Sequence, residues 1–286
     1  MYLDTLRHKV GSNMAPPRKQ KNTAAEASDT PAPALKGVRR ALEVLEHLAI
    51  EPGRAIDIAN RLGVSWATLH RTLSQLERGG FVERDGDTGR YTIGSRMWFV
   101  GTAYLASHRV LELAQPYLDA AAEKGDLTVQ LVEQSDRLAV TLYSHHTSGE
   151  VITKATYGYH FPLHCGSKGQ VLLAHAPDDF VDSYLAAPLE TLTNETVTDP
   201  DALRAQLAAI REQGFGFTEG DVQRFTGSIS APVFGRDGRL VAAVCIIGRR
   251  TTFRDAARKE EIVEIVLQTA QSISLALGWR PGNKET

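Results

Sequence analysis

Three short amphipathic segments follow one another in the first third of the chain, and they restrict the fold more than any other feature. Apolar residues recur at helical spacing over residues 37–50, 55–62 and 65–78. Gly63 follows the second segment as the expected left-handed end of a helix, and Ser65 is a good N-cap for the third. Two short helices joined by a tight turn indicate a helix-turn-helix.

A hairpin is predicted directly after the third helix. Two strand-like runs, 81–84 and 90–93, flank the turn-forming residues 85–89. A hairpin in this place is a wing, so the sequence predicts a winged helix-turn-helix over residues 36–94. Residues 1–35 lack apolar periodicity and are rich in Ala, Pro, Ser, Thr and Lys, which predicts a disordered tail.

The remainder of the 286-residue chain is long enough for a second, larger domain. A helix over residues 95–107 mixes large apolar side chains, so we expect it to link the domains and to pack against a partner. Residues 108–280 alternate helical and strand patterns, which predicts an α+β domain. The predicted helices are 111–124, 169–176, 201–213 and a long one before Gly278, and the predicted strands are 128–133, 138–144, 151–155, 228–234 and 240–247.

Composition excludes several classes of protein. The two cysteines, Cys165 and Cys245, lie far apart without a CxxC motif, so we expect no disulfide, structural zinc or cofactor. The longest apolar run, 240–247, is too short to span a membrane, and the N-terminus has no hydrophobic signal region, so a cytoplasmic protein is expected. The formal net charge of −2 argues against DNA binding by the whole surface but allows a local basic face.

The third helix is predicted to enter the DNA major groove. With Leu69, Leu73 and Leu76 turned inward, helical spacing turns the other face of this helix outward. Double-stranded DNA is therefore an expected partner, and Arg71 is the best candidate to contact a guanine or a phosphate. The predicted DNA-binding residues are Arg39, Arg40, Ser65, Trp66, Ala67, Thr68, His70, Arg71, Ser74, Arg84 and Arg90.

Two alternatives to this interpretation stay open. Trp66 either faces DNA or packs on the first helix. The helical domain itself either binds DNA or serves protein contacts with solvated arginines.

Signals for catalysis are weak. The doublet His145-His146 points to opposite faces of a strand, and Pro162 between His160 and His164 rules out a helical zinc pair. The glycine pattern over residues 214–220 fits a dinucleotide loop only loosely, and neither a GxSxG elbow nor a P-loop is present. We therefore predict a protein that is not an enzyme. The alternative is a metabolite sensor or enzyme in the C-terminal domain with an accessory helix-turn-helix.

Several runs of sequence carry a resemblance to a known family. They are Gly37–Glu46, Ile58–Leu73 and Gly89–Gly94 in the first domain, and Pro162-Leu163-His164, Gly169, 172–174, 213–215, 229–233 and 242–244 in the second. Over about residues 37–279 the chain resembles the IclR family of bacterial transcriptional regulators. The resemblance implies a GAF-like effector-binding domain, and a homodimer, or a dimer of dimers, held by the DNA-binding domains and linker helices.

The resemblance also implies the place of a small-molecule effector. One wall of the family's effector cup is the loop before the helix at Gly169, where Ser167 and Lys168 would present backbone N–H groups to an anion such as a carboxylate. The opposite wall maps to Thr218, Thr226, Ser228, Cys245 and Ile247.

The chain departs from the family pattern in this cup. The family places an acidic residue near Thr218 and hydroxyls at Cys245 and Ile247, its usual Gly-Lys is Gly169-Gln170 here, and its usual Glu-Glu is Gly220-Asp221. Walls with fewer polar groups favour an apolar or aromatic acid over a small keto-acid. For Cys245 and Ile247, packing in the core is the alternative to ligand contact.

Taken together, these patterns predict a ligand-responsive DNA-binding transcriptional regulator, a repressor that controls catabolic genes. We expect a dimer to place two helices, Ser65–Gly79 of each subunit, in successive major grooves of a pseudo-palindromic operator. Binding of a small carboxylate would then reorient the linkers at 95–107 and change the spacing of those helices.

Overall fold

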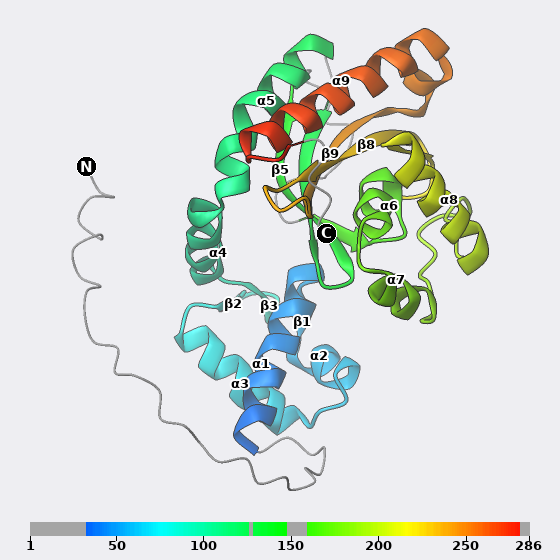
Figure 1. Cartoon of the computed structure of the whole chain (residues 1–286). Helices are drawn as coiled ribbons and strands as arrows, with labels where there is room; N and C mark the ends of the chain where they lie inside the picture. The colour runs from blue at the N-terminus through cyan, green and yellow to red at the C-terminus, as the bar shows by residue number, and fades with distance from the viewer. Residues whose placement is uncertain (1–32, 126–127, 148–158, 281–286) are drawn as a thin grey trace, which may run out of the picture. The chain divides into compact units, whose positions relative to one another are not determined.

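The computed structural model describes residues 33–125, 128–147 and 159–280, and the chain divides into two compact units, 1–98 and 99–286 (Figure 1). Of the predicted tail, residues 1–32 lie outside the described residues, and residues 33–35 are helical instead. The predicted strand at 151–155 also lies outside the described residues. The predicted domain bounds remain predictions.

Over residues 33–94, the first unit contains three helices and a small antiparallel sheet. The helices are α1 (Pro33–Ile50), α2 (Ala55–Arg61) and α3 (Trp66–Arg78). The strands are β1 (Gly53–Arg54), β2 (Val82–Arg84) and β3 (Arg90–Ile93), in the order β1-β3-β2. The turn between α2 and α3 and the β2–β3 hairpin confirm the predicted winged helix-turn-helix. β1 was not predicted, because two residues are too few to show a strand period.

The core of this unit forms where the three helices meet the hairpin. Val44 of α1, Ile58 of α2 and Leu73 of α3 are fully buried together. Leu76, which was predicted to point inward, is only half-buried. Thr72 is buried instead, and its hydroxyl donates to Thr68 O at 3.2 Å, so this polar group is satisfied inside the helix.

Helix α4 (Ser95–Ser107) has the bounds that the sequence predicted. Trp98, Phe99 and Tyr104 of this helix are each more than half exposed, although they are large apolar or aromatic side chains. Exposed apolar residues on one helix are typical of a surface that another chain covers, and the predicted packing of α4 against a partner remains a prediction.

In the part that the structure describes, the second unit is built on an antiparallel sheet of six strands in the order β6-β5-β4-β9-β8-β7. Its strands are β4 (Thr128–Ser135), β5 (Leu138–His146), β6 (His160–Pro162), β7 (Gly216–Glu219), β8 (Thr226–Phe234) and β9 (Leu240–Arg249). Its helices are α5 (Arg109–Gly125), α6 (Gly166–Ala174), α7 (Asp178–Leu185), α8 (Pro200–Gln213), the short 3₁₀ helix η1 (Arg250–Arg254) and α9 (Ala256–Ala276). The α+β class is confirmed, whereas α7, β6 and β7 were not predicted.

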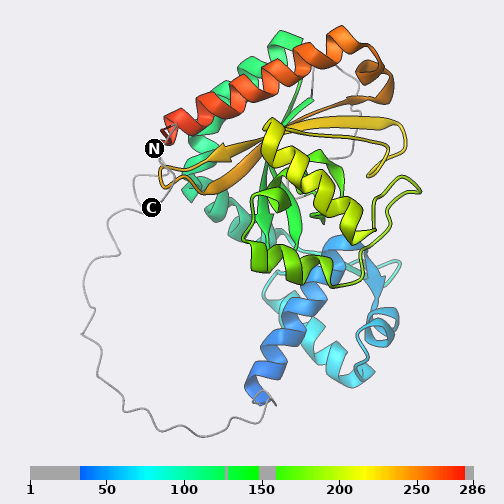
Figure 2. The same ribbon diagram turned by 45° about the vertical axis from the view of Figure 1, so that its right-hand side comes forward.

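Helices cover both faces of this sheet. In Figures 1 and 2, α5 and α9 lie side by side over one face, where Leu118 and Ile262 pack on Val244 of β9. Alternate residues of the same strand, such as Ala243, point to the other face, where they meet Leu172 of α6. The sheet therefore has two apolar cores, one under α5 and α9 and one under α6.

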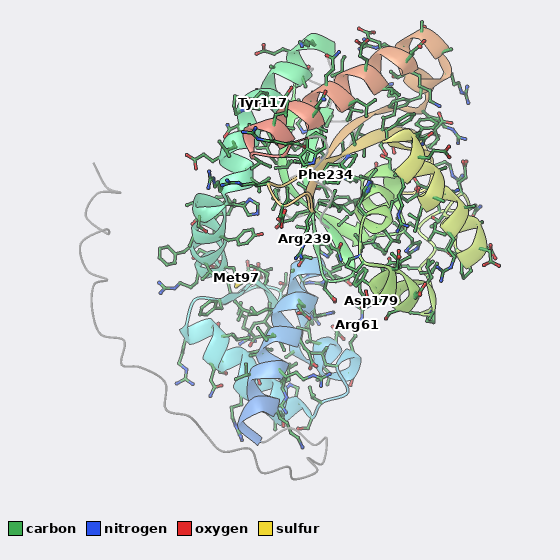
Figure 3. All side chains as sticks on the ribbon, viewed as in Figure 1. Arg61, Met97, Tyr117, Asp179, Phe234 and Arg239 are labelled. Carbon is green, nitrogen blue, oxygen red and sulfur yellow. The ribbon has the colours of Figure 1, made fainter. Side chains whose placement is uncertain are left out.

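Phe234, at the end of β8, contacts aromatic residues that follow two different helices. The ring of Phe234, labelled in Figure 3, contacts the ring of His175 directly after α6 at 5.5 Å between centroids. It also stacks on Trp279, which follows α9, at 5.7 Å. The ring of Phe234 therefore joins the segment that follows α6 to the segment that follows α9.

Candidate functional site

Helix α3 presents a polar face to solvent. Ser65 is its N-cap and accepts a hydrogen bond from Thr68 N at 3.3 Å, as the sequence predicted. Leu69 and Leu73 are fully buried, so the helix is fixed by its inner side. Arg71, on the outer side, is exposed. A helix held in this way can enter a groove without disturbing its own packing.

The structure brings the predicted DNA-binding residues together only in part: Trp66, His70 and Arg84 line one hollow of the first unit, and the others do not. Most of them are exposed, and Arg40, Thr68 and Ser74 are half-buried. Trp66 does not pack into the core: its side chain is 54% exposed and its ring lies 4.9 Å from that of His70. Arg39 pairs with Glu43 on α1 at 2.9 Å, so its charge is partly neutralised.

The wing turn is built around one carboxylate. Asp85 accepts hydrogen bonds from the backbone and hydroxyl of Thr88, at 2.7 and 2.8 Å, and from Asp87 N at 3.0 Å. The bonds from Thr88 lower the pKa of Asp85. At the base of the wing, the Arg84 guanidinium lies 5.8 Å over the Tyr91 ring, and Arg90 donates to Pro52 O. The wing and its arginines are therefore ordered by contacts within the unit.

A hollow of about 510 Å³ lies between α3, the start of α2 and the wing. Its lining includes Arg54, Ile56, Trp66, His70, Arg84 and Tyr91. Cations and exposed apolar groups lie together here, which suits contact with phosphates and with the apolar edges of bases.

In the second unit, helix α6 begins with a close approach to the sheet. Gly166 has φ +67°, a left-handed conformation that favours glycine. A Cβ on Gly169 would lie 2.6 Å from Leu163 O, so this position accepts no larger residue without a shift of backbone. Both glycines let the first turn of α6 press against the segment that precedes it.

Two N–H groups of this first turn, those of Gly166 and Ser167, are already bound by the protein itself. Gly166 N donates to Asp221 Oδ2 at 2.6 Å, and Ser167 N donates to Thr218 Oγ1 at 3.0 Å. Asp221 is 7% exposed, and burial raises its pKa while the bond from Gly166 opposes that rise. The N–H of Ser167 that we predicted would bind an anion is therefore satisfied within the chain.

A small cavity of about 30 Å³ opens beside this turn. Five of the seven predicted effector residues line it: Lys168, Thr218, Thr226, Ser228 and Ile247. Ser167 and Cys245 do not, because both are completely buried. The hydroxyl of Ser167 bonds instead to Ser228 Oγ at 2.8 Å and to Ser230 Oγ at 2.7 Å.

The side chain of Lys168 is the charged group of this cavity. It is 4% exposed, and its Nζ donates to Gln130 Oε1 of β4 at 2.6 Å. Burial lowers the pKa of Lys168 to about 8. Only the backbone of Lys168 was predicted to contact the effector. Gln130, Phe161 and Asp221 were not predicted to belong to the site, since no local pattern links them to α6.

The histidines considered for metal binding have other partners. His145 Nδ1 lies 2.6 Å from Asp119 Oδ1, and His146 Nδ1 lies 2.9 Å from Thr128 Oγ1. His164 is held between the Tyr184 hydroxyl and a backbone carbonyl, and burial lowers its pKa. Within the described residues, no group of three or more His, Cys, Asp or Glu side chains is arranged to hold a metal ion. None of the helices in that part of the chain is long and apolar enough to cross a membrane.

Comparison with known families gives two matches. Residues 37–86 match the family described as IclR helix-turn-helix domain. Residues 102–275, more than half of the chain, match the family described as bacterial transcriptional regulator IclR C-terminal. The first match lies within the first unit, and the second match lies within the second unit.

Individual relatives are similar over most of their length. The DNA-binding transcriptional repressor YiaJ of Escherichia coli strain K12 is 28% identical over 91% of this chain and 94% of its own. The glycerol operon regulatory protein of Streptomyces coelicolor is 31% identical over 78% and 87%. An IclR homologue from Microbacterium hydrocarbonoxydans, solved in complex with 4-hydroxybenzoate, is 27% identical with a TM-score of 0.69, covering 84% of this chain and 98% of that one.

These relatives regulate transcription, and the family is not one of enzymes. This confirms the prediction that the protein is not an enzyme. The prediction of the family from the sequence is confirmed as well, whereas the roles of single residues remain predictions. The chain belongs to the IclR family of bacterial transcriptional regulators.

Proposed function

We propose that the chain is a cytoplasmic repressor of catabolic genes, released from its operator by a small carboxylate. The relative from Escherichia coli is a repressor, and the one from Streptomyces coelicolor regulates an operon, which supports this role. In this proposal residues 36–94 bind DNA, residues 95–107 link the domains, and residues 108–280 bind the effector.

The observation that carries the DNA-binding role is the exposed outer face of α3. Trp66, His70 and Arg71 project from this helix. On its inner side, Leu69 and Leu73 are fully buried. Arg84 and Arg90 add charge at the wing. A groove-reading helix flanked by cations is the arrangement that direct readout and phosphate contact require.

The exposed aromatic side chains of α4 support a homodimer or a dimer of dimers. Covering Trp98, Phe99 and Tyr104 would remove apolar surface from water, which favours association. A two-fold dimer presents two copies of α3, so the operator would be pseudo-palindromic, with half-sites about one helical turn apart.

The cavity beside α6 is the proposed effector site. The homologue solved with 4-hydroxybenzoate supports a carboxylate as the class of ligand. The cavity of about 30 Å³ is far smaller than the roughly 150 Å³ that holds benzene in a protein core. A small aliphatic acid therefore needs less rearrangement here than the aromatic acid that the sequence favoured.

A DNA-binding assay at fixed salt tests the proposal. The probe is the DNA upstream of the protein's own gene, titrated with aliphatic and aromatic acids, because affinity depends strongly on salt. We expect Arg71→Ala to weaken specific binding by about 1 to 3 kcal/mol if Arg71 contacts a base. Arg254→Ala, which removes an exposed arginine of the other unit, is the matched control and should leave the affinity unchanged.

Two results would contradict the proposal. Equal DNA affinity of the Arg71 and Arg254 variants would remove Arg71 from the interface. Specific DNA binding that no acid alters would leave a regulator without the proposed effector.

A further inference from the structure

The ammonium of Lys168 is a buried charge whose hydrogen-bond partner is neutral. Its hydrogen-bond acceptor is the neutral amide of Gln130, at 2.6 Å. Among the described residues, no carboxylate forms an ion pair with it. Asp221, the buried carboxylate of the same cavity, is bound to the first turn of α6 instead. Proteins rarely bury an ammonium unless an opposite charge or a ligand compensates for the lost hydration.

The surroundings of Lys168 form one side of a ligand site. Its Nζ lies 4.8 Å from the centre of the Phe161 ring and 5.9 Å from that of Tyr159. Both rings line the cavity together with Ile247, and the hydroxyl of Ser228 lies on the same lining. Aromatic faces stabilise a cation only partly, so the charge remains open to an anion that enters the cavity.

We propose that Lys168 Nζ binds the carboxylate of the effector, which takes the place of Gln130 Oε1, while Phe161 and Tyr159 pack against the effector's apolar body. The inference rests on the proposed effector function of this cavity. It makes the effector class a monocarboxylate with an apolar body, and it assigns recognition of its charge to a side chain rather than to the backbone of α6.

Calorimetric titration of the full-length protein with two acid and amide pairs tests this assignment. Propanoate is compared with propanamide, and benzoate with benzamide, so that charge is varied while size is kept. Each acid that binds should do so about 10- to 100-fold more tightly than its amide, as expected for a charged hydrogen bond. Lys168→Met should lower the acid affinity by the same factor and remove the preference for the acid.

Lys124→Met is the matched control, because Lys124 is an exposed lysine at the end of α5. It should keep the acid preference of the wild type. The inference is overturned if acid and amide bind the wild type alike, if neither acid binds, or if Lys168→Met keeps the preference.

The two proposals fail in different ways. A ligand that changes DNA affinity equally in the wild type and in Lys168→Met overturns the anion assignment but leaves the effector function intact. Acids that bind through Lys168 without changing DNA affinity support the assignment and contradict the regulatory function.

Discussion

Helix α3 carries the proposed DNA-binding residues and helix α6 carries the cavity lysine, and their first turns are completed by different means. In α3, Ser65 supplies the cap from the adjacent position and accepts from Thr68 N. In α6, the N-cap residue Cys165 makes no side-chain bond, and Asp221 and Thr218 complete the turn from more than 50 residues away. The first helix is capped locally and the second by tertiary contacts.

This difference has a functional consequence. A locally capped helix keeps its outer face free for another molecule, which suits a surface that binds DNA. In α6 the positive end of the helix is already used by Asp221, so the backbone offers less to a ligand. The side chain of Lys168 supplies the remaining positive charge of the cavity.

The largest expected effect concerns the stability that is lost by burying the charged ammonium of Lys168. Lys168→Met should raise the free energy of unfolding of the second unit at pH 7 by on the order of 3 kcal/mol, since the pKa of Lys168 falls from 10.5 to about 8. The folded pKa lies below the unfolded one, so Lys168 itself should contribute a rise in stability as the pH increases from about 8 to 10.5. Unfolding by denaturant at pH 7 and pH 10 measures both effects.

The Met variant should lack this rise, and Lys124→Met should behave like the wild type. Burial also raises the pKa of the Cys165 and Cys245 thiols, which opposes the rise in the wild type and in both variants alike, so the difference between the wild type and Lys168→Met measures the contribution of Lys168. A Met variant that is less stable than the wild type at pH 7 would show that the ammonium stabilises the fold. The charge would then not need an anionic ligand to compensate its burial.

The next effect tests the tertiary cap of α6. Asp221→Ala leaves the N–H of Gly166 without its acceptor in a buried place, so the second unit should lose about 2 kcal/mol. Asp221→Asn keeps an acceptor and should lose less. Amide hydrogen exchange in α6 measures the change, and equal protection in the Ala variant and the wild type would mean that Asp221 does not hold the turn.

The same contrast explains what could be predicted from the sequence. The start of α3 was predicted correctly because Ser65 and the spacing of Leu69 and Leu73 are local signals. The start of α6 was predicted at Gly169, three residues late, because its cap lies on another segment. Cys245 and Ser167 were assigned to the cavity wall, but the register of β9 and the serine cluster bury both.

The smallest expected effect tests the local cap of α3. Ser65→Ala should cost the first unit about 1 kcal/mol, since the N–H of Thr68 loses its acceptor. Ser65→Asp provides an equivalent cap and should restore stability, but its negative charge should still weaken DNA binding. Hydrogen exchange follows α3, with α6 as the internal reference. Loss of protection in both helices of the Ala variant would show that the effect of Ser65 is not local, because a local cap should affect only the helix that it begins.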